Sequence, residues 1–115
     1  KSICFLVNGE PVLVVASGDN MVDDRKLANH FDVGRKKVKT ARPDQCVAIF
    51  GYQPGGVAPV GHRTPDIPVL IDADLQRYSV IWAAAGSANA NFGLTPRQLI
   101  DITGGTIIDC KRDDR

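Results

Sequence analysis

The chain has 115 residues, a length that suits one compact unit with its own hydrophobic core, so we expect a single domain over residues 1–115. Its 14 Lys and Arg residues against 13 Asp and Glu give a formal net charge of +1, which argues against a protein that holds long duplex DNA through bulk charge. Hydrophobic residues make up 43% of the chain, yet no apolar run approaches the roughly 20 residues that span a bilayer, so a membrane protein is not expected.

The first expected element is a β-hairpin. The apolar runs at residues 3–7 and 11–16 are rich in β-branched residues, and Asn8-Gly9 between them is a strong hairpin signal. The first run follows almost directly on Lys1, with no leader segment before it. We therefore expect that the chain is a fragment whose natural N-terminus lies upstream.

A helix is expected next, over residues 24–31. Asp23 is a suitable N-cap for it, and Gly34 follows as a plausible terminator. The side chains expected on its inner face are Leu27, Ala28 and Phe31.

Residues 35–42 carry five cations around two apolar positions, Val38 and Ala41. One interpretation is a solvated edge strand, because lysines commonly protect such edges. The other is a patch that contacts RNA phosphates through Lys36, Lys37 and Lys39. The sequence leaves both open.

A second helix is expected from Pro43 to about Phe50, where Gly51 ends it and begins a loop over residues 51–62. This loop holds four of the eleven glycines and two of the seven prolines of the chain. The mixture favours one fixed backbone path over a flexible one. Such a path can present N–H groups to an anion or a carbonyl oxygen.

The second half predicts buried strands at 67–72 and 79–85, and a small-residue turn at 86–91 leads to a brief strand at 92–94. Thr95 is expected to cap a helix that ends at Gly104. The apolar stripe expected on this helix is Leu99, Ile100 and Ile102. A last strand at 106–110 and a frayed tail at 111–115 complete the chain. About six strands and three short helices without regular βαβ alternation indicate the α+β class.

Few side chains in the sequence are candidates for catalysis, metal binding or cofactor binding. Cys4, Cys46 and Cys110 are odd in number and lack C-x-x-C spacing, so neither a disulfide framework nor a metal site is expected, and a reducing, cytoplasmic compartment fits best. No phosphate-binding or dinucleotide-binding glycine motif is present, and no cofactor is expected.

The remaining polar candidates each have a structural alternative. His30 is expected on a helix surface. His62 closes the glycine-rich loop, where it is more often a structural hydrogen-bonder than a base or a substrate ligand. Asp72 and Asp74 have the spacing of an acid/base or metal pair, but capping of a turn is the favoured role. Gly86-Ser87, after a buried strand, is a candidate for the opposite wall of a pocket.

The chain resembles the YbaK/ProRS-associated domain family over essentially its whole length. The residues that carry the resemblance are Lys1-Ser2, Val22-Asp23 to Lys26-Leu27-Ala28, Gly51-Tyr52 with Gly55 to Gly61, Pro68 to Asp72, Gly86-Ser87, and Leu99 to Gly104. The resemblance implies an α+β fold on a mixed, curved and partly barrel-like sheet. It also implies an enzyme that hydrolyses the ester of a mischarged tRNA, typically a small amino acid such as Ala or Cys on tRNA for proline.

The family's G-x-x-x-P loop falls on Gly55 to Pro59, and its characteristic lysine falls on Lys1. By this resemblance, backbone N–H groups near Gly55 and Gly56 stabilise the oxyanion, and Lys1 holds the substrate or terminal phosphate by charge. A hydroxyl of the tRNA itself assists the water, so no protein nucleophile is needed. The further residues expected to bind substrate are Val57, Ala58, Pro59, Gly61, His62, Asp72, Gly86 and Ser87.

The partners implied are the 3′ end of a mischarged tRNA and prolyl-tRNA synthetase, with neither DNA nor a membrane expected. An alternative is a catalytically inactive module of the same fold that binds tRNA or protein. The cation cluster at 35–42 and the expected loss of upstream residues motivate this alternative.

Overall fold

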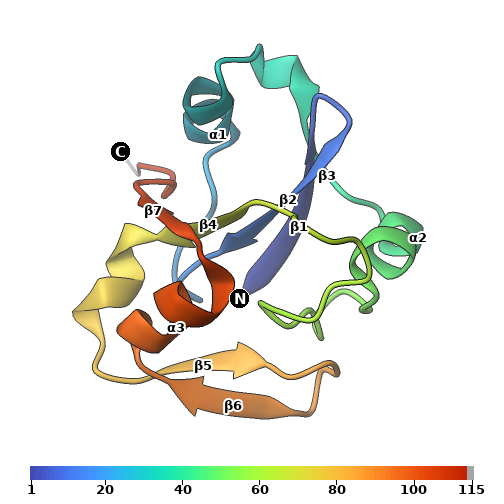
Figure 1. Ribbon diagram of the computed structural model, residues 1–115. Helices are drawn as coiled ribbons and strands as arrows, with labels where there is room; N and C mark the ends of the chain where they lie inside the picture. Colours follow the sequence, from blue (N-terminus) through green and yellow to red (C-terminus); the bar gives the residue numbers. More distant parts are fainter. Residues whose placement is uncertain (114–115) are drawn as a thin grey trace.

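The computed structural model describes residues 1–113, which form a five-stranded mixed sheet and a separate two-stranded ribbon (Figure 1). The sheet has the order β3-β1-β2-β4-β7, and the ribbon pairs β5 with β6. The strands are β1 Ser2–Val7, β2 Glu10–Val15, β3 Val38–Thr40, β4 Val69–Asp72, β5 Ile81–Ala84, β6 Asn91–Leu94 and β7 Thr106–Ile108. The predicted α+β class is confirmed. The sheet is not closed into a barrel, because β3 and β7 remain its two edges.

The helices are short. They are α1 Asp24–Phe31, α2 Pro43–Gln45 with a π-helical continuation over Cys46–Phe50, α3 Pro96–Thr103, and two 3-10 helices, Arg35–Lys37 and Ala73–Arg77. No helix within residues 1–113 is long and apolar enough to cross a membrane.

The hairpin of β1 and β2 is confirmed. The strands pair antiparallel from Val7 opposite Glu10 to Ser2 opposite Val15. Asn8 and Gly9 both have positive φ, 51° and 84°, as a two-residue turn that matches the twist of the strands requires. β2 then pairs in parallel with β4, and β4 with β7, so the sheet changes from antiparallel to parallel at β2.

The predicted helix caps are mostly confirmed. The Asp23 carboxylate accepts a hydrogen bond from the Arg25 N–H at 2.9 Å. The Thr95 hydroxyl accepts from the Gln98 N–H at 3.1 Å, and the Gln98 side chain accepts from the Thr95 N–H. The predicted bounds of α1 are confirmed, but its C-cap is Asp32, with φ of 56°, in place of the predicted terminator Gly34. Asp tolerates the left-handed conformation better than most residues, so the helix stops there.

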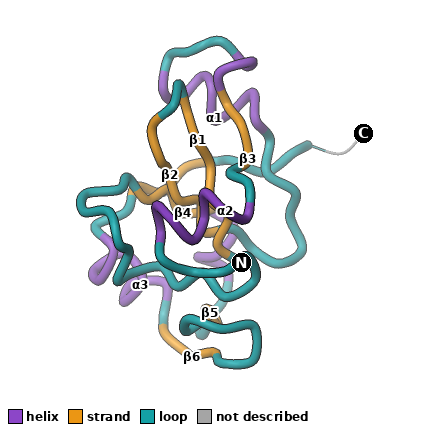
Figure 2. Tube along the Cα trace, turned by 90° about the vertical axis from the view of Figure 1, so that its right-hand side faces the viewer, coloured by secondary structure: helices purple, strands orange, loops and turns teal. Residues whose placement is uncertain are grey.

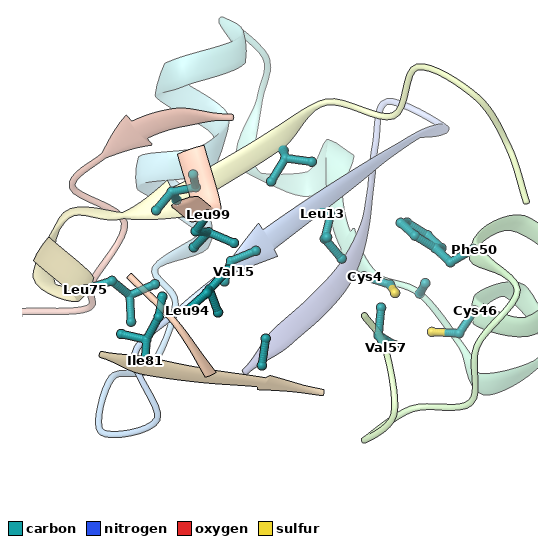
Figure 3. Packing of buried hydrophobic residues seen from close by; sticks show 14 residues of the cluster. Cys4, Leu13, Val15, Cys46, Phe50, Val57, Leu75, Ile81, Leu94 and Leu99 are labelled. Carbon is teal, nitrogen blue, oxygen red and sulfur yellow. The ribbon is translucent and has the colours of Figure 1, made fainter. Parts of the chain in front are cut away.

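Both faces of the central strands are buried. One core cluster contains Leu13 and Val15 of β2 together with residues of the π-helical segment after α2, of α3 and of the ribbon (Figure 3). The other contains Val12 and Val14 of β2 with Leu27 of α1. Alternate residues of β2 therefore serve opposite faces, which explains its continuous apolar sequence.

Three further expectations are corrected. The segment at 79–85 is not a buried central strand: β5 belongs to the ribbon, only one of its faces is covered, and Trp82 is 69% exposed. Ile102 is 48% exposed and does not join the apolar stripe of α3. The tail is held at its start, because Lys111 bridges to Val22 and the Arg112 N–H donates to the Met21 carbonyl at 2.7 Å. Residues 114 and 115 of the predicted frayed tail lie outside the described residues.

Candidate active site

The loop at 51–62 is fixed by hydrogen bonds within itself. It begins the long connection between α2 and β4, which has no helix or strand (Figure 2). The Gly56 N–H donates to the Gln53 carbonyl at 3.0 Å across a turn in which Gly55 has φ of 88°. The Tyr52 hydroxyl donates to the Val60 carbonyl at 2.7 Å. The predicted fixed backbone path is therefore present.

A second turn packs against this loop. The Gly86 N–H donates to the Gly56 carbonyl at 3.1 Å. A Cβ added to Gly56 would lie 2.8 Å from the Ser87 Cα, a distance that real side chains do not adopt. The structure thus brings together Gly56 and Gly86-Ser87, which are 30 residues apart in the chain.

Next to this contact lies a hollow of about 290 Å³. Three parts of the chain meet there: the start of β1, the end of β3 with the start of α2, and the loop. Its lining residues are Ser2, Ile3, Cys4, Thr40, Ala41, Pro43, Cys46, Pro54, Gly55 and Val57. Sequence reasoning missed Thr40 and Ala41, although both directly follow the lysines that were singled out. The hollow is the candidate site for the reacting group.

Lys1 lies beside this hollow without lining it. Its carbonyl accepts from the Ala16 N–H at 2.7 Å, which fixes it at the end of the hairpin. Lys1 and Ser2 together line a smaller hollow that faces Ala83 of β5. Since Ser2 also lines the larger hollow, Lys1 is one residue away from it.

Of the two predicted oxyanion donors, the structure removes only the Gly56 N–H. The Gly56 N–H is already used within the turn, so it is not available to a substrate oxygen. The N–H groups of Gly55, Val57 and Ala58 have no acceptor among residues 1–113. The side chains of Val57 and Ala58 are buried, and Pro59 is among the most buried residues. These three residues can therefore offer a substrate their backbone more readily than their side chains.

His62 and Gly61 stabilise the loop and do not line the hollow beside Gly55. The His62 Nε2 donates to the Ala58 carbonyl at 2.8 Å, since a carbonyl can only accept. The imidazole also packs edge-on against Phe50, with ring centres 5.6 Å apart. His62 and Gly61 line another hollow of about 350 Å³ next to Ile102. This geometry fits a structural role for His62, as a hydrogen-bond donor that stabilises the loop.

Asp72 is also not brought to the hollow. It is 1% exposed. Its carboxylate accepts from the Ser17 N–H at 3.0 Å, from the Asn20 Nδ2 at 2.8 Å and from the Asp74 N–H at 3.0 Å. Asp72 therefore caps the 3-10 helix and ties it to the end of β2, and its expected contact with substrate does not fit this burial.

No activated nucleophile lies at the hollow among the described residues. Cys4 and Cys46 line it but are buried, and burial raises the pKa of the Cys4 thiol. Burial likewise raises the pKa of Cys110 to about 12. Thiols with raised pKa values are poor nucleophiles. Within residues 1–113 no three His, Cys, Asp or Glu side chains gather in a way that could hold a metal ion.

The cation cluster surrounds an edge strand that leads to the hollow, with Lys39 in β3 and Lys36 and Lys37 in the 3-10 helix before it. β3 pairs only with β1 in the described sheet, and its last residue, Thr40, lines the hollow together with Ala41. Arg35 pairs with Asp24 at 3.0 Å, and Arg42 with Asp44 at 3.1 Å. Of the five cations in the cluster, those without an ion pair among the described residues are Lys36, Lys37 and Lys39. The edge-strand interpretation is confirmed for residues 38–40 alone, because Arg35–Lys37 form a 3-10 helix, and the phosphate patch remains a prediction.

Comparisons with known proteins identify relatives of the chain. Residues 1–102 match the family described as "Aminoacyl-tRNA editing domain". The chain is 32% identical over 115 residues to "Uncharacterized protein YwhH" of Bacillus subtilis, covering 98% of this chain and 71% of that protein. It is 32% identical over 95 residues to "Putative Cys-tRNA(Pro)/Cys-tRNA(Cys) deacylase EbsC" of Enterococcus faecalis, covering 83% of this chain and 56% of that protein.

Among solved structures, the chain is similar to one titled "Crystal structure of a putative trans-editing enzyme for prolyl tRNA synthetase". The TM-score is 0.91 at 34% identity, and the match covers 98% of this chain and 69% of that one.

Proposed function

The chain belongs to the aminoacyl-tRNA editing domain family, and on this premise we propose that it hydrolyses the ester of a mischarged tRNA. The substrate we propose is a small amino acid, such as Ala or Cys, on tRNA for proline. The name of the Enterococcus faecalis relative supports Cys on tRNA for proline, and the name of the trans-editing structure supports editing for prolyl-tRNA synthetase. By the same comparison, prolyl-tRNA synthetase is the proposed partner whose errors are corrected.

The observation that carries the proposal is the contact between Gly56 and Gly86-Ser87 beside the hollow. An aminoacyl ester is already activated, so its hydrolysis needs mainly positioning, water and stabilisation of the developing oxyanion. The N–H groups of Gly55, Val57 and Ala58 are the proposed donors to that oxyanion, because none of them has an acceptor within residues 1–113. The contact with Ser87 holds the loop that carries them.

The other roles follow from position and charge. Lys1, one residue from the hollow, is proposed to hold the phosphate of the terminal nucleotide. The vicinal hydroxyl of the tRNA is proposed to assist the attacking water, since the Cys4 thiol at the hollow has a raised pKa and is a poor nucleophile. Lys36, Lys37 and Lys39 are proposed to contact phosphates farther along the acceptor end.

The test is deacylation of tRNA for proline charged with Ala, Cys or Pro. We expect faster hydrolysis of the Ala or Cys ester than of the Pro ester. Lys1→Met is expected to lower the rate at least tenfold and Lys1→Arg to retain more of it, because the arginine keeps the charge. Ile102→Ala, an exposed position on α3, is the control. Rates equal to spontaneous hydrolysis for all three esters would contradict the proposal.

A second candidate, a module that binds tRNA without turnover, is favoured by the three unpaired lysines. Saturable tRNA binding together with no deacylation is the outcome that would select it.

A further inference from the structure

The ribbon carries a large aromatic side chain that is not packed in the hydrophobic core. Trp82 is the only tryptophan of the chain and is 69% exposed. Its partner across the ribbon is Gly93. Indole atoms lie 3.1 Å from the place where a Cβ on Gly93 would stand. The indole therefore rests on bare backbone of β6 and presents most of its surface to solvent, where a large aromatic group commonly marks a contact site.

The surroundings of Trp82 combine apolar and cationic groups. Trp82 and Lys1 line a hollow of about 220 Å³, together with Asp19, Tyr78 and Val80. The Arg77 guanidinium lies over the Tyr78 ring at 5.5 Å. Pockets for drug-sized ligands measure about 300–1,000 Å³, so this hollow suits a smaller group such as a single nucleobase.

The ribbon also connects Trp82 to the candidate active site. The chain runs from Trp82 through β5 to Gly86, whose N–H bonds to the Gly56 carbonyl. Four residues at about 3.3 Å each place these points about 13 Å apart along the strand. Lys1 lines the hollow at Trp82, and the next residue, Ser2, lines the hollow beside the loop. A flexible ligand whose ester lies beside the loop could therefore extend past Lys1 and place a neighbouring group at Trp82.

We propose that Trp82 is a stacking platform for a base of the single-stranded 3′ end of tRNA, an inference that rests on the proposed function. Exposed aromatic rings next to cations are how proteins hold single-stranded nucleic acid, since every base offers a π-face. A protein partner fits less well: Val80 is the other exposed large hydrophobic residue of this region, and two side chains fall far short of the roughly 800 Å² per partner of a stable interface.

Because Trp82 is the only tryptophan, its fluorescence reports on this site alone. Titration of the chain with the trinucleotide CCA, and separately with uncharged tRNA, should quench the emission to saturation. A blunt RNA duplex without an overhang should quench it much less. No quenching by CCA or by tRNA would overturn the platform. Emission that depends on protein concentration and not on RNA would show instead that the ribbon joins two copies, and would also overturn it.

Variants separate stacking from simple apolar contact. With fluorescein-labelled RNA, Trp82→Leu should raise the Kd for tRNA about tenfold or more, whereas Trp82→Phe should stay within about threefold, because a ring remains. Gly93→Ala should reduce the quenching, because the new Cβ meets the indole at 3.1 Å and displaces it. Ile102→Ala should change neither measurement. Equal losses for the Leu and Phe variants would contradict stacking.

Deacylation measured on the same samples distinguishes the two proposals. Hydrolysis without quenching would leave the proposed function standing and remove the platform. Quenching without hydrolysis would keep the platform and remove the deacylase.

Discussion

At the scale of single residues, Gly56 is the position where the smallest change has the clearest consequence. Its φ is not in the left-handed region, so alanine is conformationally acceptable there. The added Cβ would nevertheless lie 2.8 Å from the Ser87 backbone, which cannot move aside as a flexible side chain could. We predict that Gly56→Ala separates the two turns and lowers the deacylation rate tenfold or more, because displacement by about 1 Å costs up to 10²-fold.

Gly34→Ala is the matched control for this substitution, since its Cβ would meet nothing within 4 Å. Single-turnover kinetics and thermal unfolding of both variants would test the idea. Full activity of Gly56→Ala would show that the contact with Ser87 does not position the loop.

The lowered pKa of Asp74 indicates how the stability of the protein depends on pH. A hydrogen bond from Asn20 at 2.9 Å, with nearby Lys111 at 3.5 Å, holds the pKa of Asp74 below its usual range. A carboxyl with a depressed folded-state pKa stabilises the fold above its unfolded pKa of about 3.9, and this stabilisation is lost as the pH falls through the folded value. We predict that Asp74→Asn unfolds more easily than wild type at pH 6 but that the difference shrinks below pH 4. Denaturant titrations at the two pH values would measure it, and a constant difference would contradict the assignment.

At the scale of elements, α1 depends on its first turn. Asp23 accepts from the Arg25 N–H and precedes a helix of only eight residues, which is too short to be stable without caps and packing. We predict that Asp23→Ala lowers the free energy of unfolding by about 1 kcal/mol, whereas Asp23→Asn lowers it much less. Equal losses in urea denaturation would show that the charge, and not the cap geometry, matters.

The edge strand β3 allows the phosphate patch to be tested apart from catalysis. Lys37 and Lys39 have no ion pair among the described residues, so reversing their charge breaks no internal bridge. We predict that Lys37→Glu with Lys39→Glu weakens tRNA binding and reduces the slope of log K against log salt by about 0.7–0.9 per lost phosphate contact. Arg35→Gln, which removes a cation already paired with Asp24, is the control. An unchanged salt slope would remove the patch.

The elements also show what the sequence can predict. The hairpin, both principal helix starts and the fixed loop follow from local signals such as Asn8-Gly9 and Thr95-Pro96, and each was predicted correctly. The exposed face of β5 was not, because Ile81 to Ala84 are all apolar and a period of two cannot be seen in them. Both Asp32 and Gly34 can adopt a conformation that ends a helix, and the sequence alone does not decide which of them is the C-cap of α1.

At the scale of the whole molecule, the candidate site depends on contacts between distant segments. Gly56 meets Ser87, and Asp72 accepts from Ser17, 55 residues earlier. No local pattern contains these pairings, so the glycines were predicted as a site while the hollow and the burial of Asp72 were not. The resemblance supplied Lys1, which composition alone would have treated as an ordinary terminal residue.

The C-terminal segment, residues 109–113, contributes to stability through contacts with distant parts of the chain. The Asp23 N–H donates to the Cys110 carbonyl at 2.8 Å, and the Arg112 N–H donates to the Met21 carbonyl at 2.7 Å. The Lys26 ammonium donates to the Asp109 carboxylate and to the Lys111 carbonyl. Cys110 is fully buried in the cluster beneath α1. The segment thus joins the start of α1 to the edge strand β7.

We predict that deletion of residues 109–115 lowers the free energy of unfolding by about 2–4 kcal/mol, from two lost backbone hydrogen bonds and the lost burial of Cys110. Because this cluster lies on the face of the sheet opposite the candidate site, deacylation at a temperature where the shortened chain is still folded should stay within about threefold of wild type. Urea denaturation and deacylation of the two chains would measure both effects. A large loss of activity in the folded, shortened chain would mean that the two faces of the sheet are coupled through β4, whose alternate residues belong to the two clusters.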